Sequence, residues 1–425
     1  MKVFLDAHIH SKYSRATSKN MDLEHLATFA KLKGLNMLGT GDATFPLWFE
    51  ELKKKLKEMD NSGIYEYRGI FWIITTEVNT VYVKEGKMRK VHHLILIPNI
   101  EIAKQINEKL AKYGNLASDG RPTLKLSSPE LVEILMEISN KILIIPAHAW
   151  TSWFGVLGEY SGFNSLEECY EDEAKHVYAL ETGMSSDPSM NFRVSSLDKF
   201  TLVSFSDAHS FWTWRLGREQ VVLDLKELTY EEIFKSIKNK DKRKILFTIE
   251  TPPAYGRYHF TGHRKCGINL HPKDAIKLNN ICPKCGRKLT IGVLQRVEEL
   301  ADRPEGFVPK DAIPFKTLLP LYEIISFAWG SGELYSKKVL EEHDKLIEKF
   351  GNELNVLLNV PKEELLKVTN EKIADAILKA REGKVKYQAG ADGQYGTPIF
   401  SEEELEKLKK KQMPSLSEQK KLTQF

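Results

Sequence analysis

The stretch Val3-Phe-Leu-Asp6-Ala-His8-Ile-His10 opens the chain with a short apolar run that ends in two histidines. The residues Val3 to Leu5 are typical of a buried strand. Side chains two residues apart on a strand point to the same side, so His8 and His10 can direct two imidazoles at one point. Taken alone, the pair fits a strand end with two solvated histidines about as well as it fits two imidazoles directed at one binding point. What separates the two interpretations is whether the same arrangement recurs along the chain.

Residues 1–210 alternate β-branched runs with amphipathic helical stretches. We expect strands at 2–9, 36–41, 70–78, 90–97, 142–148, 177–182 and 201–206, and helices at 23–32, 48–59, 102–113, 129–139 and 166–176. Such alternation indicates a parallel sheet or barrel. Seven units predict an α/β fold built on a distorted (β/α)7 barrel, a relative of the eightfold barrel.

Nearly every predicted strand carries a histidine or a carboxylate at its end. These residues are His8, His10, Asp42, Glu77, His148, Glu181, Asp207 and His209, with His92 and His93 at the start of the fourth strand. The C-terminal strand ends of a parallel barrel share one face, where active sites lie. Mixed imidazole and carboxylate ligands favour Zn, with Mn and Fe next and Mg as a further alternative. We expect two or three divalent metals, with Glu77 bridging two of them, and hydrolysis of a phosphoester by an activated water.

The set His8-x-His10, Asp42, Glu77, His93, Pro146-Ala-His148 and Asp207-x-His209 resembles the PHP (polymerase and histidinol phosphatase) family of metal-dependent phosphoesterases. The resemblance implies the metal ligands His8, His10, Glu77, His93, His148, Asp207 and His209, and it gives Asp42 and His209 to a third metal or to orienting the water. Asp42 is followed by Ala43, where the family commonly has Asp-His, which weakens the third site. The fourth strand leaves two candidates: His93 matches the pattern of a histidine before an apolar run, whereas His92 would face the other side.

A second set of ligands lies in His263-x-x-Cys266 and Cys282-x-x-Cys285. Together they supply one histidine and three cysteines for a tetrahedral zinc site, with His259 and His271 as rivals for the fourth place. Four protein ligands leave no open position, so we expect a structural zinc. Basic residues interleaved with aromatic ones suit DNA contacts, although a solvated basic face is the alternative. The DNA-binding candidates are Arg257, Tyr258, His259, Arg264, Lys265 and Arg287, together with Trp150 and Trp153 after the fifth strand.

The last quarter of the chain is predicted to be helical, with apolar residues at helical spacing in 341–350, 362–367 and 371–381. The chain ends in Gln419-x-x-Leu422-x-x-Phe425, which looks like a peptide that binds a sliding clamp, because Leu422 and Phe425 fall on one side of a single helical turn. We therefore expect four regions: a barrel at 1–245, a zinc module at 246–300, a helical domain at 301–400 and a flexible tail at 401–425.

Composition limits the remaining possibilities. The 62 basic and 58 acidic residues give a net charge of only +4, so a nucleic-acid surface must come from local clustering. No apolar run approaches the roughly 20 residues of a membrane span, and no signal-peptide pattern opens the chain. Four cysteines in 425 residues do not form a disulfide framework. We expect a cytoplasmic monomer without membrane contact.

The whole-chain order of barrel, zinc module, helical region and clamp peptide resembles the archaeal endonuclease Q family. The motifs that carry the resemblance are Gly262-His-Arg-Lys-Cys-Gly267, Asn280-Ile-Cys-Pro-Lys-Cys-Gly286, Glu181-Thr-Gly-Met-Ser-Ser-Asp-Pro188 with Asn191 and Arg193, and Asp392-Gly-Gln-Tyr-Gly396. The resemblance implies nicking of DNA 5′ to a deaminated base (uracil, hypoxanthine or xanthine) or an abasic site. The expected catalytic residues are Glu77, Asp207, Asp42, Asn191 and Arg193, the last two binding the phosphate.

Three other functions fit parts of the sequence. A PHP phosphatase acting on a small phosphomonoester explains the barrel but gives no role to the zinc module or the C-terminal peptide. A non-catalytic scaffold that binds DNA and a clamp would not need so complete a ligand set. An amidohydrolase also begins with His-x-His, but the paired Asp207-x-His209 and the bridging Glu77 fit it less well.

Overall fold

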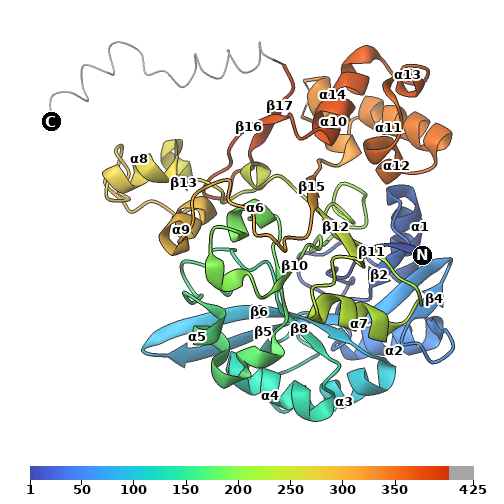
Figure 1. The fold of residues 1–425 in the computed structure, drawn as a ribbon, viewed down its shortest axis with the longest axis vertical. Coiled ribbons are helices and arrows are strands. Elements are labelled where there is room, and N and C mark those ends of the chain that lie inside the picture. The colour runs from blue at the N-terminus through green and yellow to red at the C-terminus, as the bar shows by residue number, and fades with distance from the viewer. Residues whose placement is uncertain (331, 402–425) are drawn as a thin grey trace.

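The computed structural model describes residues 1–330 and 332–401. Seven strands succeed one another around the centre of its main body, which forms the lower part of Figure 1. They are β1 (Lys2–Asp6), β2 (Met37–Gly39), β5 (Ile70–Lys84), β6 (Lys87–Ile97), β8 (Leu143–Pro146), β9 (Ala179–Glu181) and β10 (Thr201–Val203). Ladders join neighbours from β1 to β8 and join β9 to β10. Single bridges, Ile144 to Val177 and Ile9 to Ala208, connect the remaining neighbours and bring the last strand back to the first.

The fourth strand of this ring corrects the expectation that all seven run parallel. β6 is antiparallel to both β5 and β8. Only Glu85 and Gly86 separate β5 from β6, and both have positive φ, at 53° and 72°. A parallel crossover needs a dozen or more residues, whereas two residues with positive φ close a hairpin. The strand predicted at 70–78 therefore continues to Lys84, and the mixed α/β class is confirmed.

Further strands widen the sheet on the side of β1. β11 (Gln220–Asp224) lies antiparallel to β1, β12 (Ile245–Glu250) antiparallel to β11, and β15 (Phe315–Thr317) parallel to β12. The short strands β3 (Lys57–Glu58), β4 (Tyr65–Tyr67) and β7 (Thr123–Leu124) complete the sheet around β5. The sheet of the main body thus continues past residue 245.

Helices cover the outside of the ring. They are α1 (Leu23–Lys33), α2 (Pro46–Lys55), α3 (Ile100–Leu110), α4 (Ser128–Ile138), α5 (Leu166–Tyr170), α6 (Pro188–Asn191) and α7 (Tyr230–Lys238). Their starts follow from local sequence: α4 opens with a reciprocal capping box between Ser127 and Glu130, and Pro129 occupies its first turn. Among the residues with described structure, no helix is both long and apolar enough to cross a membrane.

The small module at the upper left of Figure 1 contains β13 (Thr261–His263), β14 (Ile268–Leu270), α8 (Pro272–Lys277) and α9 (Val293–Leu300). The helical domain at the top contains α10 (Leu321–Ala328), α11 (Lys337–Phe350), α12 (Glu353–Leu358), α13 (Lys362–Leu365) and α14 (Glu371–Arg381). A buried ion pair fastens this domain to α1, with Lys33 Nζ 2.7 Å from Glu353 Oε1. The predicted clamp peptide, with Gln419, Leu422 and Phe425, lies outside the described residues.

After the helical domain the chain returns to the module. β16 (Lys386–Gln388) and β17 (Thr397–Ile399) pair as a hairpin. The loop between them is bonded to the start of the module: Phe260 donates its N–H to the Gly390 carbonyl at 2.9 Å, and Gly393 donates to the Arg257 carbonyl at 3.0 Å. Segments about 130 residues apart in sequence therefore meet beside the mouth of the ring.

Candidate active site

Four side chains from three strands meet at one end of the ring. His8 and His10 follow β1, Glu77 lies on β5 and Asp207 follows β10. His10 Nε2 lies 3.1 Å from Glu77 Oε2 and 3.0 Å from Asp207 Oδ1, and His8 Nε2 lies 3.3 Å from the same Glu77 oxygen. One ligand atom from each of the four lies within 4.8 Å of the other three. Ligand atoms about 2.0–2.2 Å from a tetrahedral metal lie roughly 3.4 Å apart, so this spacing suits a metal.

A second cluster shares Glu77. His92 Nδ1 lies 2.7 Å from Glu77 Oε1, and His148 Nε2 lies 3.3 Å from the same atom. The two imidazole nitrogens are 3.2 Å apart. Glu77 therefore directs one carboxylate oxygen at each cluster, which is the bridging position that the sequence suggested.

His93 is not part of the second cluster, and its assignment as a ligand is wrong. Its Nε2 lies 3.0 Å from Thr80 Oγ1 and its Nδ1 lies 2.9 Å from the Tyr170 hydroxyl, on the far side of the strand. Successive residues of a strand face opposite sides, so only one of His92 and His93 can face the clusters. The structure places His92 there.

Carboxylates outside the clusters orient two of the histidines. His8 Nδ1 lies 2.9 Å from Glu181 Oε1, and His10 Nδ1 lies 2.9 Å from Asp42 Oδ1. A carboxylate on one ring nitrogen fixes the imidazole so that the other nitrogen faces a metal. Glu181 also accepts the backbone N–H of His148, and so supports both clusters.

Asp42 and His209 lie beside the clusters but join neither of the two groups found in the described part of the chain. Asp42 is committed to His10 and to Ser11, which donates both its N–H and its hydroxyl to Oδ2, at 2.6 and 2.7 Å. The ring of His209 packs against that of His10 with 4.4 Å between centroids. The expectation that Asp42 binds a metal is therefore corrected to a positioning role.

The electrostatics of the clusters favour a cation. Burial would raise the pKa of Glu77, but the charges of Arg121, His92 and His8 hold it well below its usual value. Burial would lower the pKa of His8, yet the charges of Glu181 and Glu77 raise it well above its usual value. His8 Nε2 is buried and makes no hydrogen bond in the structure. A buried nitrogen that makes no hydrogen bond and faces carboxylates that stay charged fits a divalent metal.

A pocket of about 550 Å³ opens over both clusters. Its wall carries arginine and aromatic side chains among polar ones: Arg15, Arg121, Trp153, Phe154, Arg218, Arg257, Tyr258 and Tyr395. Trp153 stacks on Tyr160 with 4.8 Å between ring centroids, and the Arg257 guanidinium lies 4.7 Å from the centre of the Tyr395 ring. Cationic and aromatic groups of this kind suit phosphates and bases.

Arg121 is a site residue that the sequence analysis missed. Its Nη1 lies 3.1 Å from Glu77 Oε2. It stands on the loop between α3 and β7, which packs closely on the site: a Cβ at Gly120 would lie only 2.3 Å from Asp42 Oδ2. No strand end precedes Arg121, so the pattern that revealed the other residues could not reveal it. The only local signal is the turn-forming Asp119-Gly-Arg-Pro122 sequence.

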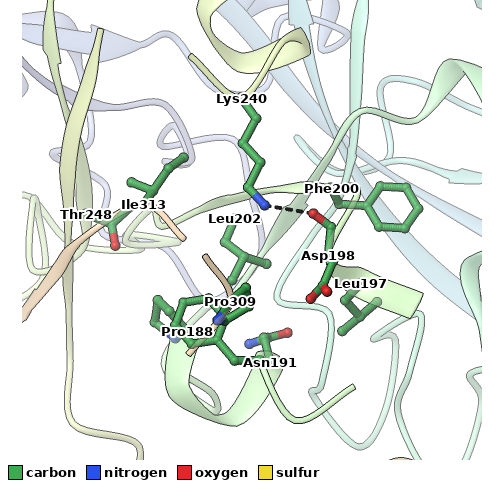
Figure 2. A pocket seen from close by; sticks show the side chains of 11 residues that line it. Pro188, Asn191, Leu197, Asp198, Phe200, Leu202, Lys240, Thr248, Pro309 and Ile313 are labelled. Carbon is green, nitrogen blue, oxygen red and sulfur yellow. Dashed lines mark hydrogen bonds between the residues drawn. The ribbon is translucent and has the colours of Figure 1, made fainter. Parts of the chain in front are cut away.

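Three predicted site residues, Trp150, Asn191 and Arg193, stabilise the fold and do not face the pocket. Trp150 is fully buried and donates its indole N–H to Asn191 Oδ1 at 2.8 Å, so it cannot stack on a base. Asn191 borders a separate small cavity of about 20 Å³, shown in Figure 2 among Pro188, Leu197 and Leu202. Its predicted contact with phosphate is therefore wrong.

The prediction that Arg193 binds the phosphate is also wrong. It forms a two-pronged ion pair with Glu298 of α9, at 2.7 and 2.9 Å, rather than facing the pocket. Arginine and carboxylate planes match in this geometry, so the pair fastens the main body to α9. The sequence showed the charge but not the partner, which lies 105 residues away.

The structure brings together the predicted zinc ligands. Ligand atoms of His263, Cys266, Cys282 and Cys285 lie within 4.8 Å of one another, and Cys285 Sγ is 3.4 Å from His263 Nδ1. The rivals are used elsewhere: His259 stacks on Phe260, and His271 accepts the N–H of Lys273 at the start of α8. Of the basic DNA-binding candidates around the cluster, Arg257, Arg264, Lys265 and Arg287 are exposed.

A family model described as the MJ0043 C-terminal domain matches residues 320–384. The chain is 30% identical over 414 residues to the uncharacterised protein YqxK of Bacillus subtilis, covering 93% of this chain and 98% of that protein. It is 36% identical over 264 residues to the uncharacterised protein MJ0043 of Methanocaldococcus jannaschii, covering 61% of this chain and 32% of that protein, so the match spans about a third of MJ0043.

Solved structures give a nearly full-length match. The crystal structure of the lesion-specific endonuclease PfuEndoQ from Pyrococcus furiosus has a TM-score of 0.85 and 38% identity, covering 95% of this chain and 97% of that one. The chain belongs to the endonuclease Q family. A complex of endonuclease Q with a 27-mer duplex that carries an abasic lesion at the active site matches equally well, covering 98% of that chain. As an endonuclease Q the chain is a metal-dependent endonuclease, and the resemblance in its sequence motifs is confirmed.

Proposed function

We propose that this endonuclease Q nicks one strand of duplex DNA on the 5′ side of a deaminated base or an abasic site. The observation that carries the proposal is the pair of clusters that share Glu77 at the base of a pocket lined by arginine and aromatic side chains. A phosphodiester needs cationic ligands at its oxygens, and an altered nucleotide needs an apolar and aromatic enclosure. The pocket offers both within one cavity.

The residues of the first cluster, His8, His10, Glu77 and Asp207, would hold one divalent metal, and Glu77, His92 and His148 a second. Such metals activate a water for attack and stabilise the leaving oxygen of a phosphodiester. Their histidine-rich environment favours Zn, Mn or Fe over Mg. Asp42 and Glu181, which contact the Nδ1 atoms of the two histidines that follow β1, would leave their Nε2 atoms free to hold a metal.

Arg121 would bind the scissile phosphate. Its guanidinium faces the clusters from the pocket wall, and it already lies against the carboxylate that both clusters share. A planar guanidinium can donate two parallel hydrogen bonds to phosphate oxygens and can balance the charge that builds there during attack. This role replaces the one predicted for Asn191 and Arg193.

The aromatic wall would receive a nucleotide turned out of the duplex. An enzyme that examines a base edge must take that base out of the stack, and bases stack on aromatic rings at a gain of about 1–3 kcal/mol each. Trp153 is 39% exposed and Tyr395 is 40% exposed, so both can accept a ring. Tyr395 comes from the loop between β16 and β17, which gives that loop a part in the pocket.

Four further proposals concern features outside the pocket. The cluster of His263 and three cysteines would hold a structural zinc in the region 246–300. The regions 1–245 and 301–400 would act as the catalytic body and a helical domain fastened to it. The peptide 419–425 would bind a sliding clamp. We also propose that the chain acts as a cytoplasmic monomer.

The test is nick mapping on duplexes of about 40 base pairs, each with a single uracil, hypoxanthine, xanthine or abasic site and with both strands end-labelled. We expect one nick, on the strand with the lesion and on its 5′ side, and no cleavage of an undamaged duplex. A small phosphomonoester provides the comparison for the phosphatase alternative. Hydrolysis of that ester without nicking of any duplex would contradict the proposal.

A further inference from the structure

The hairpin of β5 and β6 reaches far beyond the ring that it helps to form. β5 has 15 residues and β6 has 11, whereas strands usually have five or six. Figure 1 shows the pair extending sideways from the main body, on the same side as the small module with α8. The ligands Glu77 and His92 occupy its inner half, so the outer half needs a separate explanation.

One face of the hairpin leads from the active site to its tip. Residues alternate along a strand, so Asn79 and Val83 share the face of Glu77 on β5, and Met88 and Lys90 share the face of His92 on β6. The register pairs Asn79 with His92 and Val83 with Met88, and partners directly opposite each other point to the same side. Asn79 and His92 both line the pocket. The exposed tip is therefore a continuation of the pocket surface.

The opposite face is fixed to the main body. Tyr82 donates its hydroxyl hydrogen to Ser128 at 3.3 Å, and Lys84 Nζ lies 2.6 Å from Glu171 Oε1. Arg89 donates to the Gly162 carbonyl. These contacts hold the hairpin from behind, so its other face is presented on a rigid support rather than on a mobile loop.

The presented tip is apolar and basic. Val83 is 64% exposed and Met88 is 51% exposed. Single exposed apolar residues are common, but here two stand side by side across the hairpin. Lys90 shares this face, and its Nζ lies 5.7 Å from the centre of the Phe154 ring in the pocket wall. A cation between the exposed apolar pair and the pocket favours a polyanion over a protein surface. Strands rise about 3.3 Å per residue, so Met88 stands roughly 13 Å from His92, about the length of four base pairs.

We propose that this hairpin tip, formed by Val83, Met88 and Lys90, binds duplex DNA about four base pairs from the lesion. The inference rests on the proposed function, because it takes the lesion to lie in the pocket. Lysines reach phosphates, and apolar side chains insert between base steps in the minor groove. The tip thereby holds the flanking duplex in line while the altered nucleotide occupies the pocket.

The experiment uses the full chain and three lesion duplexes. One has 12 base pairs on each side of the lesion, and each of the other two has one flank cut to two base pairs, so that the flank bound by the tip is identified. The variant is Val83→Ser with Met88→Ser, and the control is Leu47→Ser on α2, where the side chain is 61% exposed. Affinity is measured by fluorescence anisotropy and from the enzyme dependence of single-turnover nicking, and thermal melting checks the fold.

We expect the double variant to bind the long duplex about tenfold more weakly, since burying one such side chain is worth at least that change. Its affinity for the duplex with the shortened flank and its maximal nicking rate should match those of the unmodified chain and of the Leu47→Ser control. Lys90→Ala should lower the slope of log affinity against log salt by about 0.9, because one phosphate contact is lost.

Equal affinity of the double variant and the unmodified chain for the long duplex would overturn the inference. So would light scattering that shows a dimer broken by the double variant with DNA affinity unchanged, because the tip would then bind a second copy. Failure of the unmodified chain to nick any lesion duplex would instead count against the proposed function. The anisotropy comparison would still decide whether the tip binds the flanking duplex.

Discussion

Replacing Arg121 tests whether a residue without any sequence signal takes part in the reaction. Its guanidinium lies 3.1 Å from the shared carboxylate of Glu77, and its side chain is 25% exposed at the pocket wall. A guanidinium about 4 Å from a phosphate charge gains about 4 kcal/mol at an effective dielectric constant of 20. Discounting about half for solvent leaves roughly 2 kcal/mol in the transition state, or about 30-fold in rate.

We therefore expect Arg121→Gln to nick an abasic duplex about 30-fold more slowly under single-turnover conditions. Arg121→Lys should lose about tenfold, because lysine keeps the charge but not the planar fork. The metal content of both variants should equal that of the unmodified chain, which separates a loss of phosphate binding from a loss of the clusters. Arg68→Gln, at an exposed arginine, is the matched control.

The result that would refute this reasoning is specific. If Arg121→Gln nicks within threefold of the unmodified chain at saturating enzyme, the guanidinium does not act on the transition state. If its metal content falls together with the rate, Arg121 supports Glu77 instead of binding the phosphate.

The remaining predictions concern stability and partners. Cys282→Ser with Cys285→Ser should remove one zinc per chain and lower both the melting temperature and DNA affinity, because metal binding is coupled to folding; unchanged zinc content would show the module to be misinterpreted. Burial raises the pKa of Glu250 from 4.5 to about 8, so the folded chain holds a proton that the unfolded chain has lost. The contribution of Glu250 to the unfolding free energy of the chain should therefore fall by about 1.4 kcal/mol per pH unit between about pH 5 and pH 8. Glu250→Gln should remove this contribution and make the slope in denaturant titrations shallower, while burial of the neighbouring Glu219, which also raises its pKa, supplies a slope of its own. Equal slopes in the variant and the unmodified chain would contradict the prediction. Deleting 419–425 should abolish co-elution with a sliding clamp and leave nicking of a short duplex unchanged, whereas slower nicking would mean that the peptide serves the enzyme itself.

Much of the site was predictable because its residues follow local rules. Each of His8, His10, His148 and Asp207 stands at or just after a strand, and Glu77 lies on one, so an alternating pattern and a strand end were enough to propose that they meet. The structure brings all five to the same end of the ring. Where the position of a ligand depended only on strand ends and on alternation along a strand, the sequence was sufficient to predict it.

The errors arose where the answer depends on distant partners or on strand direction. The choice between His92 and His93 depends on which face of β6 turns inward, and that follows from the reversal at Glu85 and Gly86. Trp150 was assigned to DNA because it follows a ligand, but the fold buries it against Asn191. Residue type shows what a side chain can do, and only packing shows whether it is available to do it.

The central claim is that the clusters sharing Glu77 cut DNA. The most direct measurement is the single-turnover nicking rate of Glu77→Ala on an abasic duplex, with metal content measured on the same preparation. We predict a rate at least about 100-fold lower, fewer bound metals, an unchanged melting profile and nearly unchanged DNA affinity, because phosphate contacts elsewhere supply that affinity. A Glu77→Ala protein that nicks at the normal rate would contradict the account.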